Sequence, residues 1–292
     1  MFFPIKAFRC TFLFVFNVLY PRLNSAGALC RLAANTAPKP GAAYCQAYSY
    51  DLQVTQAEPS TNPAAIPRPG LWFDPGRPGS GFDLHRTANG QYFLLWYTYT
   101  QSGGYPIWYL SDSAPLVRGV WRAPLSLFRW IGGTARGTRV GTVSLEMTGS
   151  TKGRFKWVLS GHNQTDDAAF LFGGGRGTGL YFPPSESGWG VSVQGDGRRS
   201  VSYAYLYDGS QPRWVTGQRT GLPNDGANIR MWRYTGSGLC PWCGGGTATA
   251  ASSGTARLML SGNSGWVSTA LALRSGRRWD KTRVPLVALT LH

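Results

Sequence analysis

Two cysteines have the spacing in this sequence most suggestive of chemistry, Cys240 and Cys243 in the order C-P-W-C. Such a pair can exchange thiol for disulfide when its first thiolate is stabilised, usually at a helix N-terminus. Gly238 precedes the pair and Gly244–Gly246 follows it, so we expect no helix there. A structural disulfide that clamps a loop is the favoured interpretation, and thiol exchange is the alternative. A zinc site needs four ligands at fixed spacing, and only two cysteines lie close together.

Hydrolytic chemistry has little support in the residues. Ser80 and Ser187 follow no G-x-S-x-G elbow. A glycosidase needs two carboxylates about 5 to 10 Å apart, and the glutamates are only Glu58, Glu146 and Glu186. The sequence therefore favours no enzymatic activity, although it does not decide the question, and it predicts no cofactor and no metal.

Aromatic and basic residues make binding the better motivated function. The chain has 12 Trp and 14 Tyr, and their rings can stack on sugars or bases while neighbouring Arg side chains pair with phosphate or carboxylate. The alternative is that these rings only seal the ends of a folded core. The candidate binding residues are Trp96, Trp108, Trp189, Arg213, Trp214 and Arg233.

The N-terminus resembles an export signal over residues 1–28. Lys6 and Arg9 supply a positive start, Thr11–Tyr20 an apolar core, and Ala26–Ala28 the small residues that a signal peptidase accepts. The apolar core is shorter than the roughly 20 residues that span a bilayer. We therefore expect an exported protein, in the periplasm, at the outer-membrane surface or outside the cell, with no transmembrane span after processing.

Four cysteines would remain in the mature chain, which allows three disulfide pairings. These disulfide candidates are Cys30, Cys45, Cys240 and Cys243.

The charge balance favours an acidic partner. The net charge is +16, and removing Lys6, Arg9 and Arg22 with the leader leaves 26 basic and 13 acidic residues, or +13. Such an excess attracts polyanions, and we expect an anionic polysaccharide or lipopolysaccharide rather than nucleic acid. The one local basic cluster is either a docking patch or a solvated loop, and it comprises Arg274, Arg277, Arg278, Lys281 and Arg283.

The chain repeats itself, which defines the elements that must position these residues. Gly70–Phe73 returns as Gly179–Phe182, and Ser80–Phe82 returns as Ser187–Trp189. The aromatic matches are Tyr97, Tyr99 and Trp108 with Tyr203, Tyr205 and Trp214. The C-P-W-C motif lies in an insertion that only the second copy carries.

The repeated residues and the composition divide the chain after the predicted signal peptide. We expect a Pro- and Ala-rich linker at 29–69, a first β-repeat at 70–175 and a second at 179–292. With 39 Gly, 19 Pro and only 14% charged residues, the composition is typical of short strands joined by tight turns. Asn89-Gly90 is a two-residue hairpin signal. The predicted fold is all-β, with each repeat an up-and-down antiparallel barrel of about eight strands that closes on itself.

Alternation along two strands suggests what fills the barrels. Tyr203, Tyr205 and Tyr207 share one face of their strand, and Tyr97 and Tyr99 share one face of theirs. Because this face is aromatic in both copies, we expect it to form the barrel interior. The opposite face, which changes between copies, would then meet solvent or the other repeat.

The repeated residues resemble a tandem unit of exported proteobacterial β-rich proteins that have no assigned activity. Its pattern is W-x-x-P, then S-G-x-G, then Y-x-x-x-G-x-P-x-W. In the second copy here, the pattern is carried by Tyr181, Pro184, Ser187, Gly188, Trp189, Gly190, Tyr205, Gly209, Pro212 and Trp214. The first copy departs from it, with Asp83 in place of the last Gly and a loop that we expect to be longer by two residues. A looser similarity links the repeats to avidin-like and lipocalin-like barrels. The resemblance implies a secreted β-module and no catalytic residues.

The function predicted from the sequence is non-enzymatic binding of an anionic polymer or glycan at the cell envelope or outside the cell. The alternatives are a small apolar ligand carried inside one barrel, and a thiol oxidoreductase that uses Cys240 and Cys243.

Overall fold

The computed structural model describes residues 60–175, 177–186 and 188–291, and residues 59–292 form one compact unit. The predicted signal peptide, Cys30, Cys45, Ser187 and most of the predicted linker lie outside the described residues. Every described element is a β-strand, so the all-β prediction is confirmed. No helix in the described part of the chain has the length and apolarity needed to cross a membrane.

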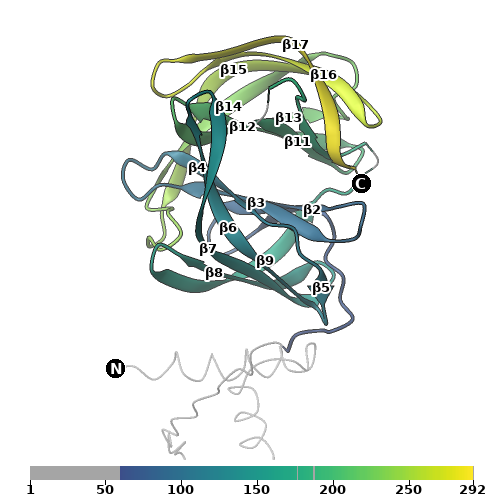
Figure 1. Ribbon diagram of the computed structural model, residues 1–292, viewed down its shortest axis with the longest axis vertical. Helices are drawn as coiled ribbons and strands as arrows, with labels where there is room; N and C mark the ends of the chain where they lie inside the picture. The colour runs from purple at the N-terminus through teal and green to yellow at the C-terminus, as the bar shows by residue number, and fades with distance from the viewer. Residues whose placement is uncertain (1–59, 176, 187, 292) are drawn as a thin grey trace, which may run out of the picture. The chain divides into compact units, whose positions relative to one another are not determined.

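The first repeat forms an antiparallel sheet of nine strands, in the spatial order β4-β3-β2-β1-β9-β8-β7-β6-β5 (Figure 1). An additional pairing joins β4, at one end of the sheet, with β6, the strand next to the other end. The strands are β1 (Gly70–Phe73), β2 (Gly81–Arg86), β3 (Tyr92–Tyr99), β4 (Pro106–Ser111), β5 (Leu116–Val117), β6 (Val120–Ile131), β7 (Thr134–Gly149), β8 (Lys152–Leu159) and β9 (His162–Phe172).

The second repeat forms a closed barrel of eight strands in chain order. They are β10 (Gly179–Phe182), β11 (Gly190–Gly195), β12 (Arg199–Asp208), β13 (Gln211–Thr220), β14 (Asn228–Ser237), β15 (Thr247–Ser261), β16 (Ser264–Ala272) and β17 (Arg278–Leu291). We call the two repeats barrel 1 and barrel 2.

The expected hairpins form where glycine permits a positive φ. Gly90 has φ 82° in the turn between β2 and β3, and Gly209 has φ 64° in the turn between β12 and β13. Both barrels close through a short seam of two residue pairs, at Leu110–Ser126 and Ser111–Leu125 in barrel 1. The seam of barrel 2 is at the corresponding place, between β13 and β14. The repeated turn and strand pattern thus specifies the same closure twice.

The strand registers correct the alignment of the repeats read from the sequence. Gly81 pairs with Tyr97, and Gly190 pairs with Tyr205. Residues in the same place in the two registers are called equivalent, so Tyr97 is equivalent to Tyr205, not to Tyr203. Likewise Gly81 is equivalent to Gly190, which makes the two β1–β2 type loops equal in length. The expectation of a loop longer by two residues is wrong, because each copy has two glycines separated by one residue, and Gly81 was matched with Gly188 instead of Gly190. The alternating tyrosines allow the same slip of two positions.

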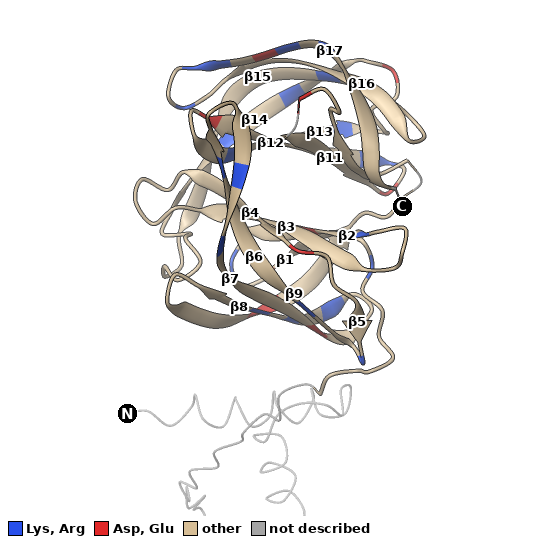
Figure 2. Ribbon diagram, viewed as in Figure 1, with Lys and Arg blue, Asp and Glu red and all other residues tan. Residues whose placement is uncertain are grey.

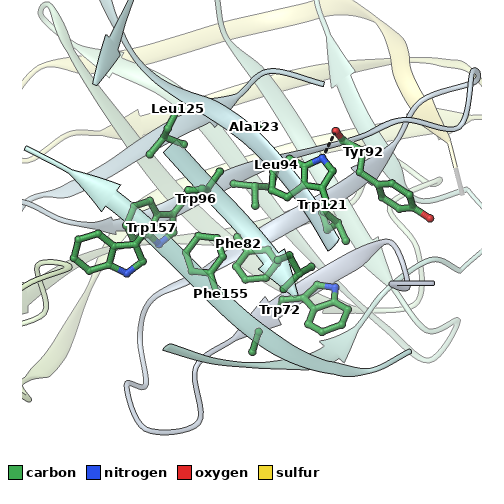
Figure 3. Packing of buried hydrophobic residues seen from close by; sticks show 14 of the residues in the cluster. Trp72, Phe82, Tyr92, Leu94, Trp96, Trp121, Ala123, Leu125, Phe155 and Trp157 are labelled. Carbon is green, nitrogen blue, oxygen red and sulfur yellow. Dashed lines mark hydrogen bonds between the residues drawn. The ribbon is translucent and has the colours of Figure 1, made fainter. Parts of the chain in front are cut away.

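Large aromatic side chains fill the interior of barrel 1 (Figure 3). Trp72, Trp121 and Trp157 are almost entirely buried, and the ring of Phe155 stacks on Phe82 with centroids 4.7 Å apart. The indole Nε1 of Trp121 donates to the backbone oxygen of Tyr92 at 2.9 Å. Burying such rings with their N–H groups bonded is a major stabilising contribution.

Aliphatic residues fill most of barrel 2. Its core includes Val193, Leu206, Met231 and Leu271, with Tyr181 as the largest fully buried ring. Both interiors are therefore packed with side chains, but their compositions differ.

The prediction that the repeated tyrosines form these interiors is wrong. Trp96, on the opposite face of β3, belongs to the core of barrel 1, and Ala204 and Leu206, opposite the tyrosines of β12, belong to that of barrel 2. Tyr97 and Tyr205 instead lie in a third buried cluster that takes residues from both barrels. Alternation identifies the two faces of a strand, but both faces are buried here, so it does not tell which faces inward.

The third cluster is an interface between the barrels whose aromatic contacts are reciprocal. The ring of Trp108 meets Tyr205 and Tyr207 edge-on, each at a centroid distance of 5.9 Å. Its equivalent, Trp214, meets Tyr97 and Tyr99 edge-on, each at 5.7 Å. These two tyrosines are the equivalents of Tyr205 and Tyr207. The interface thus has the character of a two-fold, isologous contact made within one chain.

Hydrogen bonds repeat the same reciprocity. Trp108 Nε1 donates to the oxygen of Leu206 at 3.4 Å, and Trp214 Nε1 donates to that of the equivalent Thr98 at 3.3 Å. On the backbone, Trp130 N donates to Ser210 O at 3.0 Å, and Gly236 N donates to Gly104 O at 2.9 Å. Each barrel therefore donates and accepts equivalent hydrogen bonds across the interface.

Close packing explains two glycines at the interface. Gly79 and its equivalent Gly188 have φ of 100° and 98°, in the region that favours glycine. A Cβ on Gly188 would lie 2.6 Å from the Cβ of Ala135, and one on Gly79 would lie 3.2 Å from the Cβ of Ala248. The two loops can approach the opposite barrel because neither carries a side chain there.

A buried polar network crosses the same interface. The carboxylate of Asp83 accepts from Ser192 Oγ and, at 2.9 Å, from Gln194 Nε2. His85 Nε2 lies 3.0 Å from the same carboxylate, and His85 Nδ1 lies 2.9 Å from the Thr290 hydroxyl. A buried carboxylate is tolerated only when its oxygens are bonded, and here barrel 2 supplies most of the partners.

We expect Trp108→Ala and Trp214→Ala to lower the free energy of unfolding by similar amounts, about 3–5 kcal/mol, since each removes a large buried ring from the same kind of site. Urea unfolding measures the change, and Trp266→Ala on the outer surface of barrel 2 is the control. Unequal losses, or a loss no larger than the control, would contradict the reciprocal interface.

We expect the protein to lose stability in alkali. Burial raises the pKa of Tyr207 to about 12, and burial with the nearby Asp83 raises the pKa of Tyr205 well above the ordinary 10. Because these folded-state pKa values exceed the unfolded value, the stability they contribute is intact below pH 10 and falls as the pH rises towards 12. Urea unfolding at rising pH, with ultraviolet absorbance of phenolate, tests this. Native tyrosines that all ionise near pH 10 would show it to be wrong.

Candidate functional site

The six binding residues predicted from the sequence do not come together in one place. Trp96 lies inside barrel 1, and Trp108 and Trp214 lie in the interface. Arg213 lies partly buried beside Tyr105, with the guanidinium carbon 5.1 Å from the ring centroid. Arg233 donates to the backbone oxygen of Ser252 at 2.7 Å.

Trp189 is the predicted residue that leads to a site. It lies at the end of barrel 2 formed by the loops after β10, β12 and β16. This end holds a pocket of about 550 Å³, which we call the mouth pocket. Its lining residues are Trp130, Gly133, Ser185, Glu186, Trp189, Tyr207, Gly209, Leu273, Arg277, Arg278, Trp279 and Lys281.

Aromatic rings form the walls of the mouth pocket. Trp189 and Trp279 meet edge-on with centroids 5.9 Å apart, and Trp130 of barrel 1 lies 5.6 Å from Tyr207. The Tyr207 hydroxyl is buried and has no hydrogen-bond partner among the described residues. The pocket therefore presents flat apolar faces, and the Tyr207 hydroxyl is covered by its neighbours.

Charged groups form its rim. Lys281 pairs with Glu186 and lies over the rings of both Trp189 and Trp279, 5.5 and 5.1 Å from their centroids. Arg278 pairs with Asp280 at 2.7 Å. Arg277 is exposed, and no acidic partner for its guanidinium is found among the described residues. The rim is thus net positive, with Arg277 as the cation available to a ligand.

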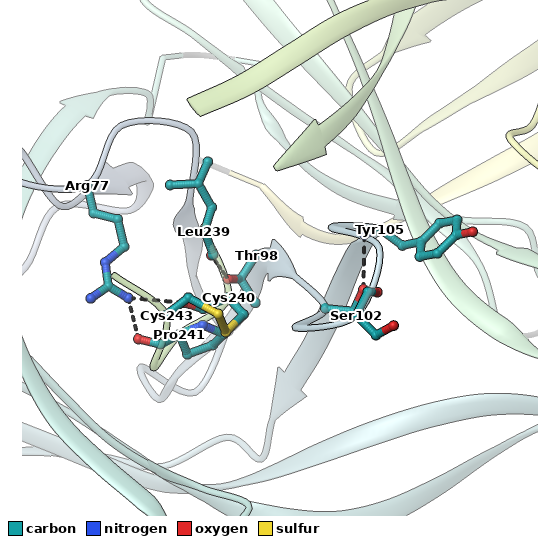
Figure 4. The surroundings of a disulfide bond; sticks show 9 residues. Arg77, Thr98, Ser102, Tyr105, Leu239, Cys240, Pro241 and Cys243 are labelled. Carbon is teal, nitrogen blue, oxygen red and sulfur yellow. Dashed lines mark hydrogen bonds between the residues drawn. A yellow bond between two sulfur atoms is a disulfide. The ribbon is translucent and has the colours of Figure 1, made fainter. Parts of the chain in front are cut away.

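A segment of the chain that carries the disulfide covers the corresponding end of barrel 1, where Trp242 packs against the barrel core. Figure 4 shows the disulfide with Arg77 and Thr98 of barrel 1 beside it. The insertion between β14 and β15 reaches across from barrel 2, and we call its residues Leu239–Cys243 the plug. Thr98 Oγ1 donates to the oxygen of Leu239 at 3.3 Å, and the Arg77 guanidinium donates to the oxygens of Cys240 and Pro241. Leu239 and Cys240 are each only 1% exposed.

The plug covers, on barrel 1, the position equivalent to the open mouth pocket of barrel 2. Its Trp242 stacks flat on His162, with centroids 4.5 Å apart and planes 8° apart. By register, His162 is equivalent to Trp279, which lines the mouth pocket. The hairpin between β6 and β7 is too short to supply a matching plug to barrel 2, because Ile131 and Thr134 are separated by only two glycines.

Cys240 and Cys243 form a disulfide within the plug. Cys243 N donates to Cys240 O at 2.9 Å, so a tight turn rather than a helix holds the pair. The favoured interpretation of the motif, a disulfide that clamps a loop, agrees with this geometry.

Thr290, His85 and Asp83 are hydrogen-bonded in the order found in hydrolase triads. The Thr290 hydroxyl also accepts from Leu180 N at 3.1 Å, and Asp83 is also held by Gln194. All the groups are buried, so we interpret the network as a bridge between the barrels.

The sequence located the mouth pocket only in part. Arg277 and Lys281 belong to the basic cluster that the sequence showed, and Trp279 lies between them, but Trp130 comes from the other repeat. That wall depends on how the barrels dock, which no local pattern reveals. Across residues 60–291, apart from the two undescribed positions, no group of three or more acidic, His or Cys side chains has a metal-site arrangement.

Comparisons of the chain with models of protein families, with curated proteins and with solved structures found no match. The resemblance to a tandem unit of exported proteins therefore remains an expectation from the motifs.

We expect the double variant Cys240→Ser/Cys243→Ser to lower the free energy of unfolding by about 2 kcal/mol, the loop-entropy value for so short a ring. Urea unfolding with and without a thiol reductant measures this. The reductant should destabilise the wild type and leave the double variant unchanged. Equal stability of the wild type with and without reductant would contradict a clamping role.

Proposed function

We propose that this chain is a non-enzymatic binding module that holds an anionic glycan in the mouth pocket of barrel 2. The observation that carries the proposal is the composition of this pocket, in which three tryptophans and a tyrosine surround about 550 Å³ beside Arg277, Arg278 and Lys281.

Stacking would supply part of the affinity. The apolar face of a sugar ring packs on an indole, and a ring placed on Trp279 would occupy the position that Trp242 takes on His162 in barrel 1. Planar rings and directed polar groups together are the usual composition of ligand pockets.

Charge would supply the preference for an anionic ligand. Arg277 presents a planar guanidinium that can bind a carboxylate or phosphate with two hydrogen bonds. Lys and Arg are also distributed over the strands of both sheets (Figure 2), in keeping with the net charge of +16. A positive field of this kind raises the association rate with a polyanion. A location at the cell envelope or outside the cell fits this ligand and the predicted signal peptide.

The other two functions considered from the sequence gain no specific support. Side chains pack the interiors of both barrels, so we place no apolar ligand inside them. Cys240, the first cysteine of the C-P-W-C motif, is 1% exposed and held by contacts to barrel 1, which is unlike the accessible thiolate that exchange requires.

We expect Arg277→Ala to weaken binding to immobilised acidic polysaccharide or lipopolysaccharide about tenfold, the effect of losing a charge-assisted hydrogen bond. The matched control is Arg198→Ala, which removes the same charge from the exposed turn between β11 and β12 at the other end of barrel 2. Trp279→Ala tests the stacking wall.

Retention of the protein on the immobilised polysaccharide or lipopolysaccharide should also fall as the salt concentration rises from about 0.05 to about 0.5 M. Salt screens the attraction between the basic residues and the anionic ligand. Elution that does not depend on salt would reject the electrostatic part of the proposal. Equal binding by the Arg277 and Arg198 variants would remove the mouth pocket as the site.

A further inference from the structure

A second pocket lies between the barrels and shares Trp189 with the mouth pocket. It has a volume of about 560 Å³, and we call it the interface cleft. Its walls include Phe93, Leu95, Trp108, Phe128, Leu180 and Tyr205. The few polar side chains around it include Thr87, Ser111 and Ser113.

The two-fold character of the interface gives this cleft a counterpart. A smaller pocket of about 390 Å³ is lined by Val201, Tyr203, Thr216 and Tyr234. By register these are the equivalents of Phe93, Leu95, Leu110 and Phe128, which line the interface cleft. The two pockets are therefore the same place on the two sides of the interface.

One substitution accounts for much of the difference between them. On the counterpart side, Tyr203 stacks on Tyr97 with ring centroids 4.7 Å apart and planes 24° apart. Its hydroxyl lies close enough to that of Tyr97 for the two groups to interact. On the cleft side, Leu95 stands in the position of Tyr203, so neither the ring nor the hydroxyl is supplied.

Because Leu95 stands in this position, Tyr205, the equivalent of Tyr97, lacks the partner that Tyr203 provides to Tyr97. Tyr205 lines the interface cleft, and its side chain is only 2% exposed. Its hydroxyl is buried with no hydrogen-bond partner among the described residues, so a ligand in the cleft reaches it by displacing the side chains that cover it. A buried hydroxyl without a partner is unfavourable, and a ligand that supplied one would relieve the cost.

We propose that the interface cleft binds a planar aromatic molecule that carries one hydroxyl or carbonyl group, such as a phenol or naphthol. The ring packs on the face of Tyr205 as Tyr203 packs on Tyr97, and the polar group bonds the Tyr205 hydroxyl. The volume is in the range of small-molecule sites. This site does not depend on the mouth pocket or on its proposed glycan.

The experiment uses 2-naphthol as the probe and isothermal titration calorimetry as the measurement. Naphthalene, which lacks the hydroxyl, and decanoate, which lacks the ring, are the comparison probes. We expect saturable binding of 2-naphthol to one site of the wild type, tighter than that of either comparison probe.

Three variants locate the site. Leu95→Tyr rebuilds the missing ring and should abolish 2-naphthol binding while the protein stays folded. Tyr203→Leu should open the counterpart and raise the stoichiometry from one to two. Tyr205→Phe keeps the shape of the cleft and should weaken 2-naphthol binding about fivefold, the effect of one hydrogen bond, without changing that of naphthalene.

Several results would overturn the proposal. One is an absence of saturable 2-naphthol binding to the wild type. Another is a folded Leu95→Tyr variant that binds 2-naphthol as tightly as the wild type does. A third is tighter binding of decanoate than of 2-naphthol, which would indicate an acyl-chain site. If Leu95→Tyr does not fold by circular dichroism, Tyr205→Phe decides, since it removes one oxygen atom. Equal affinity of Tyr205→Phe and the wild type for 2-naphthol would then refute the role of the hydroxyl.

Discussion

The packing of two tryptophans against four tyrosines holds the described part of this protein together. Trp108 lies between Tyr205 and Tyr207, and Trp214 lies between Tyr97 and Tyr99. Each barrel has its own core, so each could bury its interior without the other. The outer faces of β3 and β12, however, are too apolar to face water, and docking them on each other buries both. The mouth pocket, the interface cleft and the plug all exist because of that docking.

Departures from the two-fold pattern are where the molecule acquires features that a ligand could use. The insertion that carries Cys240 and Cys243 closes the end of barrel 1, while the short β6–β7 hairpin leaves the end of barrel 2 open. Leu95 in place of a tyrosine widens one of two equivalent pockets. The two-fold arrangement therefore provides the scaffold. Where one barrel has a group that the other lacks, that group indicates what kind of ligand would occupy the vacant position.

The fold was predictable from the sequence because its signals are local. Gly-centred turns and alternating strands specified two antiparallel sheets of about eight strands each, and the structure has nine and eight. The face of Tyr97 was not predictable, because alternation cannot tell a barrel interior from an equally buried docking face. For the same reason Trp130 was missed as a wall of the mouth pocket: it reaches the pocket only across the interface. The network of Asp83 and His85 was missed because its partners are Ser192 and Gln194, which share no charge or motif with them.

Double-mutant cycles on the interface test its reciprocity most directly. The two cycles pair Trp108 with Tyr207, and Trp214 with Tyr99, using alanine at each position and urea unfolding as the measurement. Reciprocal packing predicts coupling free energies of the same sign and similar size in both cycles, about 0.5–1.5 kcal/mol, the range for aromatic pairs. Coupling near zero in either cycle would contradict the interface described here.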